Sequence, residues 1–259
     1  MKSQGFKSIL GLVALVVLTV WFNTDFTLDT SDQKTVPVSN QSNQYLLAVT
    51  WHPSFCEKRP SRRECAPKPA YQVGSNHLVL HGLWLAQSNQ HYCGLSNHVI
   101  SADKKGKWHQ LAKLNIEPET RKRLIDLMPG YSSYLHRHEW YKHGTCMTDL
   151  SADDYFQVSL NLIQELIESP FGYWLNNNIG QKVSTKEVKE QFETSFGANS
   201  AKRLIVDCYR DEGRRVISEL KISLSGDLGQ KSRLKELIVD GPVLGKSCPH
   251  GILDPVGLQ

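Results

Sequence analysis

The sequence lacks several features that would assign it to common protein classes. It has no internal repeats, which argues against a solenoid or a propeller. None of its six cysteines forms a C-x-x-C pair, and its formal net charge is only +4. A charge of this size does not by itself indicate nucleic-acid binding, which usually shows a stronger basic excess. With 259 residues, 40% of them hydrophobic, the chain can bury a substantial core.

The N-terminal apolar run, residues 9–22, is shorter than the roughly 18 residues that favour a membrane-spanning helix. Two lysines precede it and polar residues follow it, which predicts that residues 1–23 are a signal peptide or an N-terminal membrane anchor. Large residues end the run where a cleavage site needs small ones, so both alternatives stay open. Residues 24–43 are polar and are predicted to be a flexible spacer. Residues 44–259 are predicted to form a single domain.

Export would explain the cysteines. An even set without metal-type spacing, in an oxidising compartment, predicts three disulfides. The pattern alone leaves the pairing open. The six positions are Cys56, Cys65, Cys93, Cys146, Cys208 and Cys248.

Residues 138–146, HEWYKHGTC in one-letter code, gather two imidazoles, a carboxylate and an ammonium group. In a helix, Glu139, Lys142 and His143 would share one face, and His138 would lie beside Lys142. The two histidines are one residue too far apart for the zinc-protease motif H-E-x-x-H, being separated by roughly 140° around a helix. Lys142 would also bring a cation to any metal. We interpret the cluster as acid–base and anion-stabilising groups for a metal-free reaction on a phosphate or acyl group, with a solvated charged turn as the alternative.

The rest of the domain predicts an α+β fold. Residues 45–51 and 77–81 are apolar runs typical of strands, separated by a Pro- and Arg-rich loop that holds Cys56 and Cys65. Helices are predicted over residues 118–128 and after capping boxes at Ser151 and Ser184, and strands at residues 204–208 and 220–224. Helices gathered between early and late strands favour a central, mainly antiparallel sheet.

The second strand ends at His81, and HGLW at residues 81–84 would by itself indicate a strand-end histidine near a core tryptophan. Together with HEWYKHGTC, however, it resembles the two active-site segments of the ribonuclease T2 family of exported acid ribonucleases. The resemblance extends from LAVTWHPSFC at residues 47–56 to Cys248, with Val206-Asp-Cys-Tyr between them. One departure is that Leu85-Ala86 stands where many relatives have Pro-Asp, so the family's acidic base-recognition residue is absent.

The resemblance implies a function and a set of roles. It implies an endoribonuclease that cleaves single-stranded RNA through a 2′,3′-cyclic phosphate, with low base specificity and without a metal or other cofactor. His143 would be the base and His81 the acid, because two histidines can hold opposite protonation states at mildly acid pH. Glu139 and Lys142 would stabilise the phosphorane, His138 would contact the phosphate, and Trp84 would stack on a base.

Further expectations follow from the same resemblance. The disulfides would be Cys93–Cys146 and Cys208–Cys248, leaving Cys56–Cys65 as a local clip. The protein would be an exported monomer, periplasmic or secreted, with RNA as substrate, no stable DNA partner and a membrane tether if residues 1–23 are retained. Tyr92 and Leu135 are expected to serve packing rather than base binding. The remaining histidines are expected to lie on the surface or in loops: His52, His77, His91, His98, His109, His136 and His250.

Three hypotheses compete with this interpretation. A catalytically inactive relative would need to have lost His81 or His143, and both are present. A metal-dependent hydrolase would be sensitive to chelators. A signal-anchored structural protein would explain residues 9–22 and leave the HEWYKHGTC cluster without a reason.

Overall fold

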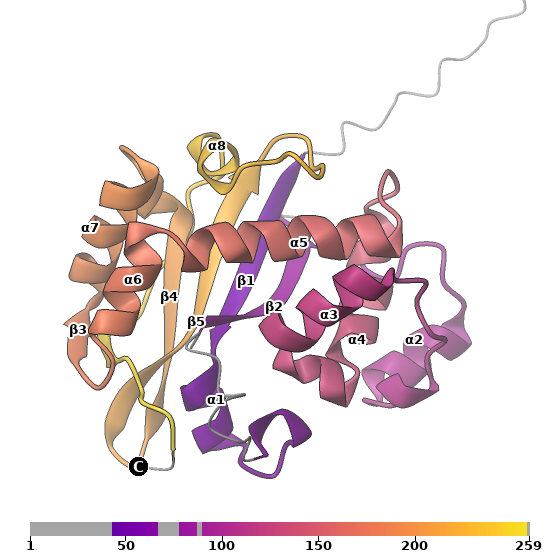
Figure 1. Cartoon of the computed structure of the whole chain (residues 1–259), viewed down its shortest axis with the longest axis horizontal. Helices are drawn as coiled ribbons and strands as arrows, with labels where there is room; N and C mark the ends of the chain where they lie inside the picture. The colour runs from indigo at the N-terminus through magenta and orange to yellow at the C-terminus, as the bar shows by residue number, and fades with distance from the viewer. Residues whose placement is uncertain (1–42, 67–77, 87–89, 258–259) are drawn as a thin grey trace, which may run out of the picture. The chain divides into compact units, whose positions relative to one another are not determined.

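A six-stranded sheet forms the centre of the fold in the computed structural model, which describes residues 43–66, 78–86 and 90–257 (Figure 1). Its order is β2-β1-β5-β6-β3, with β4 also paired to β5, and every pairing is antiparallel except the short one between β5 and β6. The predicted α+β fold with a mainly antiparallel sheet is therefore confirmed. The strands are β1 (Gln44–Trp51), β2 (Leu78–Leu85), β3 (Lys182–Ser184), β4 (Leu204–Asp211), β5 (Arg214–Ser225) and β6 (His250–Ile252).

Alternation along the central strands gives the sheet one apolar and one more polar face. On β1, Leu47, Val49 and Trp51 are at most 1% exposed and share one core with alternate residues of β5. Helix α5 (Ala152–Ile167) crosses this face (Figure 1) and adds its own buried residues to the same core. The opposite face of β5 carries Glu219 and Lys221, so polar groups are free to meet there.

The helices predicted from capping residues and local sequence patterns are present at the expected positions. Ser151 and Ser184 each accept a hydrogen bond from the backbone N–H three residues on, and form complete capping boxes before α5 and α7 (Thr185–Phe196). The helix predicted at residues 118–128 is α3 (Pro118–Leu127). The other helices are α1 (His52–Lys58), α2 (Asn97–Lys104), α4 (Leu135–Lys142), α6 (Pro170–Asn177) and α8 (Leu234–Val239).

The predicted Pro- and Arg-rich loop after β1 was partly wrong, because its first part is helix α1. Pro53 stands in the first turn of this helix, where the missing N–H costs nothing. The buried hydroxyl of Ser54 donates to the carbonyl of Ile217 at 2.7 Å and fixes the helix to β5. Tertiary contact thus stabilises a helix that the local composition did not indicate.

Three disulfides, one local and two long-range, cross-link the described chain. They are Cys56–Cys65, Cys93–Cys146 and Cys208–Cys248, the pairs that the resemblance implied, and the described residues contain no free cysteine. Cys93–Cys146 closes a sequence separation of 53 residues and anchors the turn after α4. A constraint of this length contributes roughly 2–4 kcal/mol to stability.

The predictions for residues 1–23 and for nearly all of the spacer lie outside the described residues. The residues that the structure does describe belong to one compact unit, Ser42–Gln259. No helix within that described part is both long and apolar enough to cross a membrane.

Candidate active site

A β-bulge at His81 shapes one wall of the site. In the pairing of β1 with β2, Ala48 faces Gly82 and Val49 faces Leu80, which leaves His81 as an extra residue. In a regular strand, His81 and Trp84 would point to opposite faces because they are three residues apart. Here their rings meet edge to face, with centroids 5.2 Å apart. The bulge therefore turns both side chains toward the same side of the sheet.

The buried hydroxyl of Tyr155 holds β2 in place from helix α5. It donates to the carbonyl of Leu83 at 2.9 Å and accepts from the N–H of Leu83 at 3.2 Å. Because β2 lies at the edge of the sheet, these backbone groups would otherwise need other partners. The backbone beside Trp84 is consequently fixed by the core.

Helix α4 supplies the opposite wall, and His143 caps its C-terminal end. The helix stops at Lys142, His143 has φ −116° and ψ −50°, and a 3-10 turn, η5 (Gly144–Cys146), follows. A Cβ on Gly144 would lie 2.2 Å from a ring carbon of Trp140, so only glycine fits this close approach. Glu139, Lys142 and His143 therefore belong to the last turn of this helix, because the N–H of His143 still donates to the carbonyl of Glu139 at 3.0 Å, as in a helix.

Glu139 is the centre toward which the site converges. It is fully buried, and its Oε2 accepts a hydrogen bond from Trp84 Nε1 at 2.7 Å. Its Oε1 lies 3.7 Å from His81 Nε2 and 3.8 Å from His138 Nε2. The carboxylate fits only because residue 82 is glycine, since a Cβ there would lie 2.0 Å from Glu139 Oε2. Two imidazoles and an indole therefore surround one buried carboxylate.

His81 is held from behind by a second carboxylate. Its Nδ1 lies 2.9 Å from Glu219 Oε2, and 32% of its side chain is exposed. Burial lowers the pKa of His81, but the hydrogen bond to Glu219 and the charges of Glu139 and Glu219 outweigh this effect, despite opposition from Lys221. The pKa of His81 is raised overall, which favours the imidazolium.

His138 is held in a comparable way by a different carboxylate. Its Nδ1 lies 2.9 Å from both oxygens of Asp103, which is buried at the end of α2. Asp103 also accepts a hydrogen bond from the hydroxyl of Tyr92 at 2.8 Å. The ring of Trp108 stacks on His138 with centroids 4.7 Å apart and planes 25° apart. These contacts fix the orientation of the His138 ring, with Nε2 toward Glu139.

His143 has a different environment, made of rings rather than carboxylates. Its ring stacks on Trp84 with centroids 5.3 Å apart, and the rings of His91 and His138 approach it edge-on at 5.3 and 6.4 Å. Burial, followed by the positive charge of Lys142 and then of neighbouring imidazoles, lowers the pKa of His143 to about 2. Within the described part of the chain, no carboxylate is hydrogen-bonded to it. The neutral imidazole is therefore strongly favoured in the free protein.

Lys142 is half-buried beside His143 and lowers its pKa. Its backbone carbonyl accepts a hydrogen bond from the N–H of Tyr92 at 3.0 Å. Its ammonium group has no hydrogen bond or ion pair with the residues that the structure describes. The ammonium is thus available to an anion.

Sequence reasoning missed several residues of this site. Glu219, Asp103, Trp108 and His91 all contact a site histidine, yet each is separated from its partner by at least 30 residues and stands in no recognisable motif. The alternation of residues 220–224 was a partial signal, because extending it backward places Glu219 on the polar face with Lys221.

One expectation about the other histidines was wrong. His136 is 6% exposed and stacks on Tyr131, with ring centroids 4.0 Å apart, and burial together with Arg137 lowers its pKa to about 4. His91 is exposed, as expected, and its ring also lies against that of His143. His77 lies outside the described residues.

The one group of possible metal ligands found among the described residues is His52, Cys56 and Cys65. The two cysteines form a disulfide, so neither offers a thiolate. This cluster therefore has one remaining ligand, which is too few for a structural metal site.

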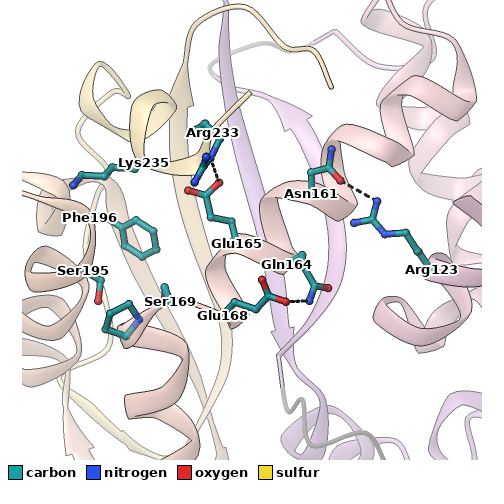
Figure 2. A pocket seen from close by; sticks show the side chains of 11 residues that line it. Arg123, Asn161, Gln164, Glu165, Glu168, Ser169, Ser195, Phe196, Arg233 and Lys235 are labelled. Carbon is teal, nitrogen blue, oxygen red and sulfur yellow. Dashed lines mark hydrogen bonds and ion pairs between the residues drawn. The ribbon is translucent and has the colours of Figure 1, made fainter. Parts of the chain in front are cut away.

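A separate groove of about 500 Å³ lies along the outer side of α5 (Figure 2). Its polar walls are largely paired with one another: Arg233 with Glu165, Arg123 with Asn161, and Gln164 with Glu168. None of the histidines or carboxylates described above lines it. It is distinct from the candidate active site.

The family model "Ribonuclease T2 family" matches residues 42–236. The chain belongs to the ribonuclease T2 family and is an endoribonuclease.

Individual relatives agree with this assignment. Ribonuclease I of Escherichia coli K12 is 26% identical over 206 residues, covering 71% of this chain and 76% of that protein. Ribonuclease 1 of Arabidopsis thaliana is 25% identical over 221 residues, covering 79% and 82%. Among solved structures, trichomaglin, described as an S-like ribonuclease, is similar with a TM-score of 0.53 and 17% identity over 82% of this chain and 98% of its own. The last similarity concerns the fold alone.

Proposed function

We propose that this enzyme cleaves single-stranded RNA by metal-independent transesterification through a 2′,3′-cyclic phosphate. The observation that carries the proposal is a difference among the three site histidines. His81 and His138 are each backed by a carboxylate, whereas His143 is surrounded by aromatic rings. A carboxylate partner favours the charged imidazole, and burial without one favours the neutral form. One site thus offers both an acid and a base.

The base in this mechanism is His143, which removes the proton from the 2′-OH. Its low pKa keeps it neutral in the free enzyme. The negative charge of a bound phosphodiester favours the protonated form, so binding moves this pKa upward toward the working pH, where general bases are most effective. The acid is His81, whose raised pKa keeps a proton on Nε2 for the leaving 5′-oxygen.

The remaining residues stabilise charge and bind substrate. The free ammonium of Lys142 and the imidazole of His138 neutralise the equatorial oxygens of the phosphorane. Glu139 holds the Trp84 indole by a hydrogen bond and sets the positions of His81 and His138. Trp84 provides a sequence-tolerant stacking surface. With Leu85-Ala86 beside it in place of an acidic residue, low base specificity follows.

The nucleophile comes from the RNA itself. The 2′-OH is already next to the phosphorus, and this intramolecular placement supplies rate that a metal-bound water would otherwise provide. DNA has no such group and should survive. We also propose that the enzyme acts outside the cytoplasm, because three disulfides suit an oxidising compartment, and that it works as a monomer.

A chimeric oligonucleotide with one ribose in a deoxyribose background tests the proposal. In EDTA, cleavage is expected only on the 3′ side of that ribose, giving a 2′,3′-cyclic phosphate and a free 5′-OH, with the all-deoxy oligonucleotide as control. His81→Ala and His143→Ala should each slow this cleavage by about 10²–10⁴-fold. Cutting at a deoxy position, 5′-phosphate ends, or loss of activity in EDTA would each contradict the mechanism.

A further inference from the structure

A chain of alternating charges runs from His81 across the polar face of the sheet. Glu219 Oε2 lies 2.9 Å from His81 Nδ1, and Glu219 Oε1 lies 3.3 Å from Lys221 Nζ. Lys221 Nζ in turn lies 2.6 Å from Asp207 Oδ2. The four residues come from β2 and from the consecutive strands β4 and β5, which are distant from β2 in sequence. Each charge therefore has an opposite charge on at least one side.

The sheet geometry makes this chain possible. Strand β1 lies between β2 and β5, so side chains of β2 and β5 must reach over it to meet. On the same face, β1 presents two small residues at this point: Ala48 pairs with Lys221, and Thr50 pairs with Glu219. Neighbouring strands are about 4.8 Å apart, so a bridge over one strand spans roughly 10 Å. Larger side chains at these β1 positions would block it.

We propose that Glu219 is a positioning residue for His81. We also propose that Lys221, by pairing with the same carboxylate, limits how strongly Glu219 favours the protonated form of His81. By accepting the hydrogen bond from Nδ1–H, Glu219 fixes the ring so that Nε2 faces Glu139 and the phosphate site. The bulge leaves His81 without a directly paired residue on β1, and Trp84 and Glu139 contact the ring from one side. Glu219 holds the ring from the other side, at Nδ1. This inference rests on the proposed role of His81 as the acid.

The charged groups around His81 act in opposite directions on its protonation. Glu219 from β5 and Glu139 from α4 raise the pKa of His81, while Lys221 from β5 lowers it. His143, at the end of α4, is also close enough for the two imidazoles to interact. Burial would raise the pKa of Glu219, but His81 and Lys221 lower it overall and keep it ionised. Glu219 and Lys221 should therefore shift the acid's titration with opposite signs.

The test is the pH dependence of kcat/KM for Glu219→Gln and Lys221→Met on one RNA substrate. Glutamine keeps the shape and a hydrogen-bond acceptor but removes the charge. The alkaline limb, where the acid loses its proton, should move to lower pH by about one unit in Glu219→Gln and to higher pH by a smaller amount in Lys221→Met. Asp207→Asn, one step further from His81, is the matched control and should leave the limb within about 0.2 units of wild type.

A merely structural role would lower kcat across the whole pH range without moving either limb. Unchanged alkaline limbs in both variants, or shifts of the same sign, would overturn the inference. If Glu219→Gln does not fold, the upward shift in Lys221→Met, a partly exposed residue, decides alone. Failure of the proposed function is recognised separately: it has failed if His81→Ala retains wild-type activity, whatever the variants of Glu219 and Lys221 do.

Discussion

Glu139 and Asp254 are both carboxylates without exposed surface, yet their surroundings differ. Around Glu139 lie an indole N–H and two imidazoles, one of which, His81, has 32% of its side chain exposed. Around Asp254 lie the guanidinium of Arg214, 3.6 Å away, and the carboxyl group of Glu57. Burial of a carboxylate therefore does not mark a reaction site. A reaction site is indicated instead by neighbouring groups that can exchange protons and are accessible to solvent.

The Asp254 region instead locks the end of the chain against the sheet. Trp51 Nε1 on β1 donates to the carbonyl of Asp254 at 2.8 Å. Arg214 on β5 also reaches Glu57 of α1 at 2.5 Å and Asp211 at 2.9 Å. Four segments thus meet around one guanidinium. Disturbing this region should change stability, whereas disturbing the Glu139 region should change catalysis.

Replacing each carboxylate by its amide gives the largest expected contrast. Glu139→Gln removes the negative charge that faces His81 and His138, and kcat should fall by about 10²-fold or more. Asp254→Asn should leave kcat within about twofold, because no group around it reaches the substrate. Initial rates on single-stranded RNA and circular dichroism at the same temperature provide the measurement. Equal losses in two folded variants would remove the distinction between the regions.

Gly82→Ala sharpens the comparison without touching an ionisable group. The new Cβ would lie 2.0 Å from Glu139 Oε2 and 2.7 Å from Trp84 Nε1, so these two groups must shift and the hydrogen bond between them is disturbed. A displacement of this size should lower kcat/KM by about 10–100-fold. Gly245→Ala is the matched control, because a Cβ there meets nothing within 4 Å. Activity of Gly82→Ala equal to that of the control would show that the position of Glu139 is not critical.

The pH dependence of stability is the smallest expected effect and concerns Asp254. Burial, then its hydrogen bond and charge interaction with Glu57, raises the pKa of Asp254 from 3.8 to about 7. The folded state binds this proton more tightly than the unfolded state. The protonated Asp254 therefore contributes favourably to the free energy of unfolding below pH 3.8, and this contribution is lost as pH rises through 7. The free energy of unfolding of Asp254→Asn, relative to that of wild type, should therefore rise by on the order of 1–3 kcal/mol between pH 4 and pH 8.

Urea unfolding of both proteins across this range measures that gain. Comparing the two proteins at each pH cancels the opposing contributions of His136 and His143. Their lowered pKa values make stability fall as pH drops below 6.5 in both proteins. A difference in unfolding free energy that stays constant with pH would show that Asp254 is ionised in the folded protein.

Local features of the fold could be predicted from the sequence. Capping boxes at Ser151 and Ser184 involve residues three apart, and the helices that follow them began where expected. Helix α1 was missed because its stability depends on the contact between Ser54 and β5. Such a contact depends on the completed sheet and leaves no periodic pattern in the segment itself.

In the site, too, local features could be predicted from the sequence and long-range contacts could not. Glu139, Lys142 and His143 stand together in sequence, so their proximity was predictable. The bulge at His81 was not, because it depends on the register of β2 against β1. The backing carboxylate Glu219 lies 138 residues from His81, and its approach requires the small residues of β1 between them.

The central claim is that His81 and His143 hold opposite charge states in the free enzyme because their surroundings differ. An NMR titration of their ring resonances, assigned with the His81→Ala and His143→Ala variants, measures this directly in the absence of RNA. His81 should titrate above the ordinary value of 6.5 and His143 well below it, so that at pH 6.5 the first is mainly charged and the second neutral. A titration midpoint of His143 above that of His81 would contradict the account.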